Sequence, residues 1–534
     1  MKKINKLMFL LLFVTIAAGC KKDFLDVPLR GRLSTDVFPA AQAVVGCYTV
    51  FLSADKDWSL WEAWNSYVFG NVLSDDAYKG GSSESDQAEM GQMERFETTP
   101  GNGTVSSFYF TYYHYIFVFN TTLEGLKNSK DLTDSLRNRY MGEVRFLRAF
   151  AYTRLMTAFG SKSGNLGLVI VDHPLLANEI GKVPRSNFQD TWNFIENDLR
   201  FAEDHLPAKE QYASKDLGRA TKGAAQALLA RAFMFTSDWK NCEDYAYKVI
   251  ASNSYQLEPE FKDVFSKANK NGKESIFEFS YTIDTYFGSG GYDFSHGSWW
   301  ATSQQPQPNG WGIGALTKDL LNEFTQDPGD PRIIWTFLFN GDNDISDGNS
   351  TTLTFDKGVD PDKLHLRKVW DPKYLQIGGQ TDFNLIVLRL ADVLLMYAEA
   401  ANENGKTAEA LTALNQVRSR ARQSSYVDPY RNVSGYNFPT NMPAASRVPD
   451  VISTDKIQVR NAIWHERRVE LAGESLRFFD LVRQGRAGNV LRTFAATYGT
   501  LKGKAFTDNK NESLPIPQNE MQASSGLIVQ NPGY

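Results

Sequence analysis

Residues 391–421 read ADVLLMYAEAANENGKTAEALTALNQVRSRA, and their periodicity predicts two helices, over 388–404 and 408–422. An upstream stretch repeats the pattern at a constant offset of 168 residues. The repeat places Ala230, Phe233, Cys242, Ala246 and Val249 over Ala398, Ala401, Ala410, Leu414 and Val417. Small residues at these positions let antiparallel helices touch, as in tetratricopeptide repeats, and such hairpins stack because one alone cannot bury its apolar face. The alternative is two unrelated hairpins with coincidental alanines.

The rest of the chain favours an all-α fold with one irregular part. Further helices are expected over 36–52, 58–73, 108–127, 133–159, 188–205, 218–236, 239–252, 455–471 and 475–484. A polar loop is expected up to residue 105, another over 424–453, and a loop tail from residue 501. Residues 255–384 are rich in Gly, Pro, Asn, Asp and aromatics, with short helical periods. We therefore predict tetratricopeptide-like hairpins as a scaffold and a loop-rich ligand-binding part, with residues 20–254 and 255–534 as two parts of one compact body.

The N-terminus has the features of an export signal. Lys2, Lys3 and Lys6 precede an apolar run over 7–16, which is too short to span a bilayer, and small residues lead to Cys20. Small residues directly before a cysteine resemble the lipobox of bacterial lipoproteins. That resemblance implies a signal peptide over 1–19, cleavage before Cys20 and a lipid on its thiol. The alternative is an ordinary secretory signal with a chance cysteine.

Composition excludes some functions. The formal charge of the 534-residue chain is −5, which gives no electrostatic reason to bind nucleic acid. Besides Cys20, only Cys47 and Cys242 are present, both in apolar helical contexts. They allow one disulfide or two buried free thiols, and we expect the thiols.

Several ordered motifs carry a family resemblance. They lie at residues 74–81, 143–149, 218–224, 391–400, 414–421, 463–485, 514–520 and 530–534. Together they resemble the SusD/RagB family over essentially the whole mature chain. The resemblance implies an outer-membrane lipoprotein of Bacteroidota-type bacteria that is lipid-anchored and faces the medium. It also implies four tetratricopeptide-like units, binding of nutrients (most often oligosaccharides), no catalysis, and a lid-like association with a SusC-type TonB-dependent transporter.

Aromatic residues are the main candidates for ligand contact. Trp58, Trp61 and Trp64 are spaced by three and form a stripe on one helical face. Rings in Gly-, Ser- and Pro-rich loops are hard to explain as core, and sugar rings present C–H faces that pack on indoles while nearby polar groups bind hydroxyls. The predicted ligand-binding residues are Trp61, Trp64, Asp75, Asp76, Tyr281, Tyr286, Tyr292, Trp299, Trp300 and Trp311. Core packing or transporter contact is the alternative for the tryptophans.

The charged C-terminal block does not favour catalysis. Glu466 and Glu470 lie one helical turn apart among arginines, which hold carboxylates ionised, the wrong state for a general acid. We expect a structural ion-pair network there, and the same role for Arg145, Arg148, Arg418 and Arg420. The sequence has no nucleophile-elbow or phosphate-loop motif.

No metal or other cofactor is expected. Asp342, Asp344 and Asp347, with Asn343 and Asn349, resemble a calcium loop, but the sixth position is Asp347 where the turn needs Gly. A solvated surface turn is therefore favoured over a calcium site. The six histidines include no His-x-x-x-His pair for zinc.

These observations predict a surface lipoprotein that captures oligosaccharides and delivers them to a SusC-type transporter. One alternative is a peptide- or glycopeptide-binding lipoprotein of a RagB-type uptake system. A more remote one is a lipid-anchored glycoside hydrolase, which needs two carboxylates about 5–5.5 or 6.5–9.5 Å apart across a cleft. A purely structural surface protein is the remaining class.

Overall fold

The chain is described by a computed structural model. It describes residues 38–52, 62–282, 303–304, 306, 310–344, 351–355, 359, 361–370, 381–428, 431–433, 436–439 and 442–534. Within these residues, no helix is both long enough and apolar enough to cross a membrane.

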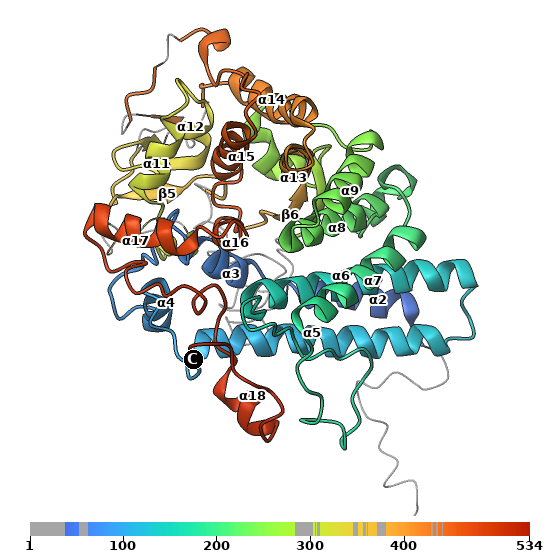
Figure 1. Cartoon of the computed structure of the whole chain (residues 1–534). Helices are drawn as coiled ribbons and strands as arrows, with labels where there is room; N and C mark the ends of the chain where they lie inside the picture. The colour runs from blue at the N-terminus through green and yellow to red at the C-terminus, as the bar shows by residue number, and fades with distance from the viewer. Residues whose placement is uncertain are drawn as a thin grey trace, which may run out of the picture.

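Stacked helical pairs form the scaffold and rise through one side of the molecule, from α5 and α6 to α13 and α14 (Figure 1). The scaffold helices are α2 (Ala40–Thr49), α5 (Gly103–Asn128), α6 (Asp134–Phe159), α7 (Phe188–His205), α8 (Lys222–Thr236), α9 (Trp239–Ala251), α13 (Leu390–Glu403), α14 (Thr407–Gln423) and α15 (Lys456–Glu470). Each of α6, α8 and α13 packs against the helices before and after it in the stack. The all-α, hairpin-based class is therefore confirmed.

The repeated hairpins pack as their alanine pattern predicts. All ten residues of the repeat are buried, in α8–α9 and in α13–α14, and α9 packs directly against α13. Side-chain caps start the first hairpin: Thr221 Oγ1 accepts from the backbone N–H of Ala224 at 3.0 Å, and Asp238 Oδ1 from that of Asn241 at 3.2 Å. The prediction of two stacked hairpins is confirmed.

Shorter helices surround this scaffold. They are α3 (Glu62–Tyr67), which continues as the π-helix η3 (Val68–Val72), α4 (Ala88–Glu94), α11 (Lys318–Phe324), α12 (Arg332–Thr336), α16 (Arg477–Arg483), α17 (Ala487–Tyr498) and α18 (Gln518–Ala523). Single 3₁₀ turns lie at Lys209–Gln211, Ser214–Asp216, Phe261–Phe265, Lys267–Asn269 and Ala444–Ser446. Helix α4 lies within the predicted polar loop and α18 within the predicted loop tail, so those two predictions were too simple.

A few short strands also interrupt the helical fold. They are β1 (Ser275–Phe279), β2 (Phe337–Phe339), β3 (Asn343–Asp344), β4 (Thr351–Thr352), β5 (Leu364–Leu366), β6 (Leu385–Arg389) and β7 (Arg431–Asn432). Antiparallel pairs join β1 to β6, with Phe279 opposite Leu385, and β2 to β5, while β3 lies between β4 and β7. Apolar residues with strong β-propensity make β1 (SIFEF) and β6 (LIVLR). These strands order part of the segment that was expected to be irregular.

The charged C-terminal block is a buried ion-pair network, as predicted. Arg332 Nη1 lies 2.5 Å from Glu466 Oε1 and 2.8 Å from Glu470 Oε2, and Arg418 Nη1 lies 2.7 Å from Glu466 Oε2. Arg420 also pairs with Glu470. Because arginines surround both carboxylates, the structural interpretation of this block is confirmed.

Arg145 and Arg148 form the corresponding pair on α6. Both contact Asp198 of α7, at 3.8 Å from Arg145 Nε and 2.7 Å from Arg148 Nε. The structural role predicted for them is therefore confirmed.

The end of the chain returns to its N-terminal half. Asn531 Nδ2 donates to the carbonyl oxygen of Phe159 at 2.9 Å, and Lys502 Nζ donates to that of Val72 at 2.5 Å. The two parts of the chain are thus joined by direct hydrogen bonds far apart in sequence.

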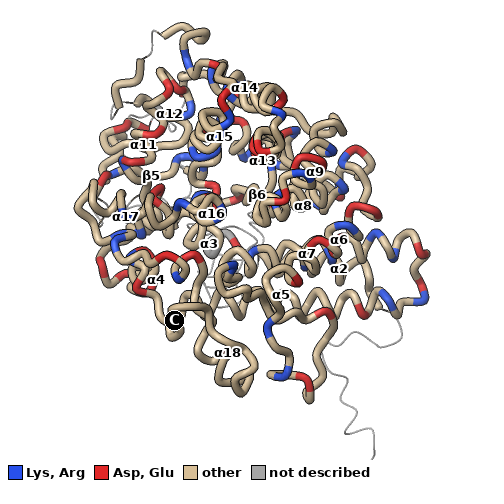
Figure 2. The backbone as a smooth tube through the Cα atoms, viewed as in Figure 1, with Lys and Arg blue, Asp and Glu red and all other residues tan. Residues whose placement is uncertain are grey.

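Other expectations have clear outcomes. Cys47 and Cys242 are free and buried, which confirms the expectation of two thiols. Asp342 is fully buried and its Oδ2 accepts from the backbone N–H of Phe339 at 2.9 Å, so the prediction of a solvated surface turn is wrong for Asp342. Asp347 and Asn349 of the same predicted turn lie outside the described residues. Acidic and basic residues are interspersed along the described chain (Figure 2), in keeping with the mild net charge.

Candidate functional site

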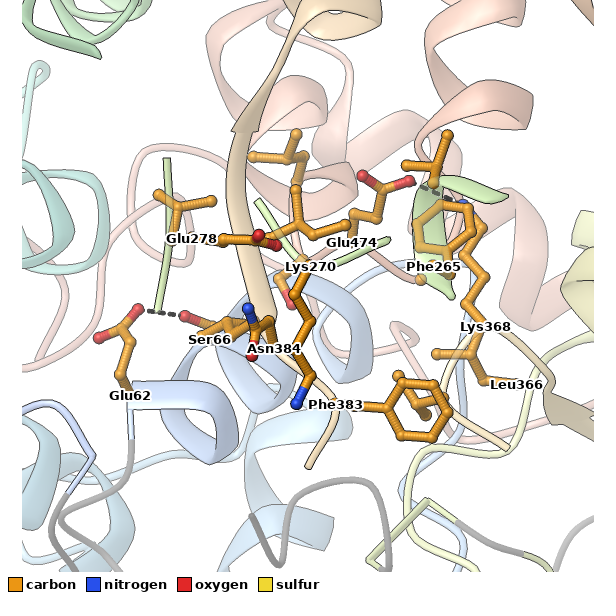
Figure 3. A pocket seen from close by; sticks show the side chains of 18 of the residues that line it. Glu62, Ser66, Phe265, Lys270, Glu278, Leu366, Lys368, Phe383, Asn384 and Glu474 are labelled. Atoms are coloured by element: carbon orange, nitrogen blue, oxygen red, sulfur yellow. Dashed lines mark hydrogen bonds and ion pairs between the residues drawn. The ribbon is translucent and has the colours of Figure 1, made fainter. Parts of the chain in front are cut away.

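A small cavity lies where α3, the β1–β6 pair and the loop after α15 meet (Figure 3). Its volume is about 70 Å³. The described lining combines aromatic and aliphatic groups with charged ones: Glu62, Ser66, Phe150, Arg154, Arg231, Val264, Phe265, Lys267, Lys270, Glu278, Leu366, Lys368, Val369, Phe383, Asn384 and Glu474 are its main side chains. The cavity therefore offers both ring faces and hydrogen-bonding groups.

Close backbone approach brings α3 to the C-terminal loop. A Cβ on Gly70 would lie 2.1 Å from the carbonyl oxygen of Ser475, so only glycine allows this contact. Ser475 also lines the cavity, as do Glu62, two turns before Gly70, and Ser66, one turn before it. The glycine thus positions one wall of the cavity against the other.

Glu62 is held by several donors on the α3 side. Its carboxylate accepts hydrogen bonds from Ser66 and Tyr112, and its Oε1 lies 3.2 Å from Arg154 Nε. Burial raises the pKa of Glu62 to about 7, although the charge of Arg154 opposes the shift. Glu62 therefore exchanges its proton near neutral pH while remaining bonded inside the protein.

Lys368 occupies the opposite side. Its Nζ lies 2.7 Å from Glu474 Oε1 and 4.5 Å from the centre of the Phe265 ring. Figure 3 shows Lys368 beside these two side chains. Burial lowers the pKa of Lys368 to about 8, although the negative charge of Glu474 opposes this shift. On this side of the cavity, the ammonium group of Lys368 therefore lies over the face of the Phe265 ring.

Lys270 and Asn384 form the polar edge. Lys270 Nζ donates to Asp382 Oδ2 at 2.7 Å and to the carbonyl oxygen of Tyr281 at 3.1 Å. Asn384 Oδ1 accepts from the backbone N–H of Tyr281 at 3.0 Å. Burial raises the pKa of Glu278, whose carboxylate accepts from the backbone N–H of Asn271. These contacts fix the backbone where β1 ends.

The volume limits what the described lining can hold. Sites for small molecules usually measure about 300–1,000 Å³, so 70 Å³ suits a few waters or one projecting group. Glu62 and Glu278 both line the cavity, but their carboxylates are engaged by internal donors. The arrangement therefore suits recognition of a polar group better than hydrolysis across two carboxylates.

The predicted aromatic residues have different outcomes. Trp61, Tyr286, Tyr292, Trp299 and Trp300 lie outside the described residues, as does Cys20, and the side chain of Trp64 in α3 is also outside them. Tyr281 is described: its side chain is buried, and its backbone forms hydrogen bonds with the cavity residues Lys270 and Asn384. Trp311 is half-buried against the main core and is not part of the cavity lining.

Asp75 and Asp76 lie in a separate ion-pair cluster. Arg477 binds Asp75 through two hydrogen bonds of 2.9 Å, and Arg468 Nε donates to Asp76 Oδ1 at 2.8 Å. Although burial alone would raise the pKa of Asp75, the guanidinium groups of Arg468 and Arg477 lower it. The described geometry gives both carboxylates internal cationic partners, and a hydroxyl-binding role for them stays a prediction.

Sequence reasoning missed the side chains that do line the cavity. Lys270, Lys368, Phe265 and Phe383 come from the segment predicted as irregular, and Glu474 from the charged block. Only the high content of aromatic and charged residues in 255–384 could have drawn attention to them. Among the described residues, no group of three or more His, Cys, Asp and Glu is placed to hold a metal ion.

Comparison with known families covers most of the chain. The model for the SusD family matches residues 273–534, and a model described as "Starch-binding associating with outer membrane" matches residues 23–234.

Curated relatives and solved structures agree with these matches. A SusD-like protein P25 of Formosa agariphila is 24% identical over the full length of both chains, and a SusD-like protein of Bacteroides ovatus is 23% identical over 90% of this chain and 82% of its own. A structure titled "Laminarin binding SusD-like protein" superposes with a TM-score of 0.71 at 25% identity, over 93% of this chain and 99% of its own. Surface glycan-binding protein A from Bacteroides thetaiotaomicron, in complex with laminarihexaose, superposes with a TM-score of 0.71 at 22% identity, over 92% and 98%.

Proposed function

The chain belongs to the SusD family, and on that basis we propose that it is a surface lipoprotein that binds oligosaccharides and passes them to a SusC-type TonB-dependent transporter. We propose a glycan ligand because the chain superposes, over 93% of its length, on a structure titled "Laminarin binding SusD-like protein". The ligand class is therefore a glycan, and laminarin-type β-glucans are the first members to test.

Chain connectivity supports ligand contact beside the central cavity. Trp61 is bonded directly to Glu62, which lines the cavity. Tyr281, whose backbone contacts Lys270 and Asn384, lies near the start of the segment that carries Trp299 and Trp300. The predicted aromatic residues would supply stacking faces, and the cavity would receive a hydroxymethyl or hydroxyl group.

The membrane association is proposed from the N-terminus and the family. Small residues before Cys20 follow the lipobox pattern, and one matching family model is described as associating with the outer membrane. A lipid on Cys20 would hold the protein at that membrane, next to the transporter.

Binding without catalysis is the proposed activity. The relatives are named as SusD-like and glycan-binding proteins. In this chain the buried Glu466 and Glu470 are held by arginines, and Glu62 and Glu278 are bonded internally. None of these four carboxylates is arranged as a free acid–base pair across an open cleft.

Affinity electrophoresis of a soluble form that begins after Asp23 tests the proposal. The gels would contain laminarin, starch or other polysaccharides, and the variants would be Trp299→Ala, Trp300→Ala and Trp311→Ala. Trp239→Ala is the matched control, because Trp239 is a half-buried indole of the scaffold helix α9. We expect one glycan to retard the wild type and the control, and retardation to be lost in at least one of the three loop variants.

The opposite results are equally informative. If no polysaccharide retards the protein but peptides bind to it, the ligand is a peptide and the glycan proposal is wrong. Retardation that survives in all three loop variants would place the glycan away from these tryptophans.

A further inference from the structure

A second, larger groove is lined by residues of α11, α15 and α17 and shares no described lining residue with the central cavity. Figure 1 shows where these three helices lie. Its volume is about 370 Å³, within the range of small-molecule sites. The amides of Gln326, Asn461 and Asn489, the hydroxyl of Thr493 and the indole of Trp464 line it. Planar amides, hydroxyls and an indole are groups that hydrogen-bond and pack against a sugar ring.

The acidic groups of this groove are already neutralised. Arg468 contacts Asp319 Oδ2 at 2.7 Å and Glu323 Oε2 at 3.1 Å, and His465 Nδ1 lies 2.6 Å from Glu323 Oε1. Asp75, which also lines the groove, is bound by Arg477 and Arg468. Each lining carboxylate therefore has a cationic partner.

Arg486 is the exception among the cations. Its guanidinium carbon lies 4.6 Å from the centre of the Trp464 ring. Among the described residues, no carboxylate lies within ion-pair distance of Arg486, and its buried Nε has no hydrogen-bond partner. Burial, together with the like charge of Arg477, lowers the pKa of Arg486 to about 10, so the group is still charged at neutral pH.

Arg486 and the acidic side chain of Asp319 lie at opposite ends of α17. Arg486 directly precedes α17, whereas Tyr498 at its last position donates to Asp319 Oδ1 at 3.2 Å. At a rise of ~1.5 Å per residue, the helix separates these ends by roughly 18 Å. Asp75, whose charge also acts on Arg486, is already bound by Arg477 and Arg468. An anion beside Arg486 therefore meets the one lining guanidinium group that, among the described residues, has no carboxylate partner.

We propose that this groove is a second binding site and that it takes an acidic sugar residue. The anionic substituent, a carboxylate or a sulfate ester, pairs with the Arg486 guanidinium through charge-assisted hydrogen bonds. The ring hydroxyls bond to Asn461, Asn489 and Thr493. The site is separate from the proposed glycan site, so failure of either proposal leaves the other standing.

Isothermal titration calorimetry of the soluble protein tests this site. The probes are methyl glucuronide, a methyl glucoside sulfate, neutral methyl glucoside and inorganic sulfate. We expect one or both acidic sugars to bind, with an affinity at least about tenfold above neutral methyl glucoside and above inorganic sulfate. Binding of only one acidic sugar would support the site and identify the anion it prefers.

Variants locate the binding. Arg486→Gln should weaken the acidic sugar at least about tenfold, whereas Arg492→Gln should leave its affinity unchanged. Arg492 is the matched control because it lies on the same helix but pairs with Asp508 and does not line the groove. Asn489→Ala, an exposed position, should weaken the acidic sugar without changing the thermal unfolding temperature.

Three results would overturn the inference. One is the absence of binding of either acidic sugar to the wild type. The second is equal affinity for inorganic sulfate and the sulfated sugar, which would leave an anion site without sugar recognition. The third is unchanged binding in both Arg486→Gln and Asn489→Ala.

Discussion

Arg332 is a fully buried cation with three carboxylate partners. Its guanidinium lies 2.5 to 2.8 Å from Asp330, Glu466 and Glu470. Replacing it with Met would leave these buried carboxylates without their shared counter-charge. We expect Arg332→Met to lower the free energy of unfolding by about 3–5 kcal/mol in urea denaturation.

An exposed lysine provides the control for that measurement. Lys240 pairs with Asp244 at 2.6 Å, but its side chain is 80% exposed. Lys240→Met should leave the free energy of unfolding nearly unchanged, because exposed ion pairs contribute little to stability. Similar losses in both variants would show that the Arg332 cluster has no special role in stability.

His465 lies between two carboxylates and gives stability a defined pH dependence. Burial opposes its charge, but hydrogen bonds to Asp327 and Glu323 outweigh burial and raise the pKa of His465 to about 9, from 6.5. Because the folded pKa is the higher one, this stabilisation is complete below pH 6.5 and is lost as the pH rises through about 9. His465→Gln should therefore lower the thermal unfolding temperature at pH 6 and have little effect above pH 9.5. An equal decrease at both pH values would contradict this origin.

At the scale of elements, the packing of the second repeated hairpin depends on its small residues. Ala410 of α14 is fully buried, whereas Ala408 on the same helix is exposed. A larger side chain at Ala410 must push α14 away from α13. We expect Ala410→Leu to cost about 1–3 kcal/mol in the free energy of unfolding. Ala408→Leu, the matched control, should be nearly neutral, and an equal cost there would argue against close helix contact at Ala410.

These hairpins were predictable because their signal is local and periodic. Ala398, Ala401 and Ala410 mark a helix contact within about twelve residues of chain. The helix α17 and the pair β2–β5 escaped prediction, since short elements carry few periodic positions and depend on partners elsewhere in the fold. Gly70 of the π-helix after α3 lies against the backbone of Ser475, a contact between distant segments that no local pattern reveals.

The candidate site was only partly predictable for the same reason. Glu62, Lys270, Lys368 and Glu474 are far apart in sequence and meet only in the folded chain. Sequence reasoning selected aromatic residues in loops, and most of these lie outside the described residues. It also selected Asp75 and Asp76 for their position after the second helix, but not their arginine partners, which come from α15 and α16.

At the scale of the whole molecule, the two thiols report on the integrity of the fold. Cys47 and Cys242 lie in separate scaffold helices and are fully buried. Burial raises the pKa of Cys47 to about 12 and also raises that of Cys242, so little thiolate exists at neutral pH. A soluble form without Cys20 should show almost no reaction with a disulfide reagent when native and two reactive thiols in guanidinium chloride. Rapid reaction of the native protein would show that the scaffold opens locally.

The hydrogen bond from Asn531 to Phe159 joins residues 372 positions apart. This contact closes a very long loop, and contacts between residues so far apart in sequence form slowly because that loop must close first. Until the last residues are available, the carbonyl oxygens of Val72 and Phe159 lack the donors Lys502 and Asn531. We therefore expect the growing chain to complete its fold only after its last residues have been synthesised, when the C-terminal tail can pack onto the N-terminal part of the body.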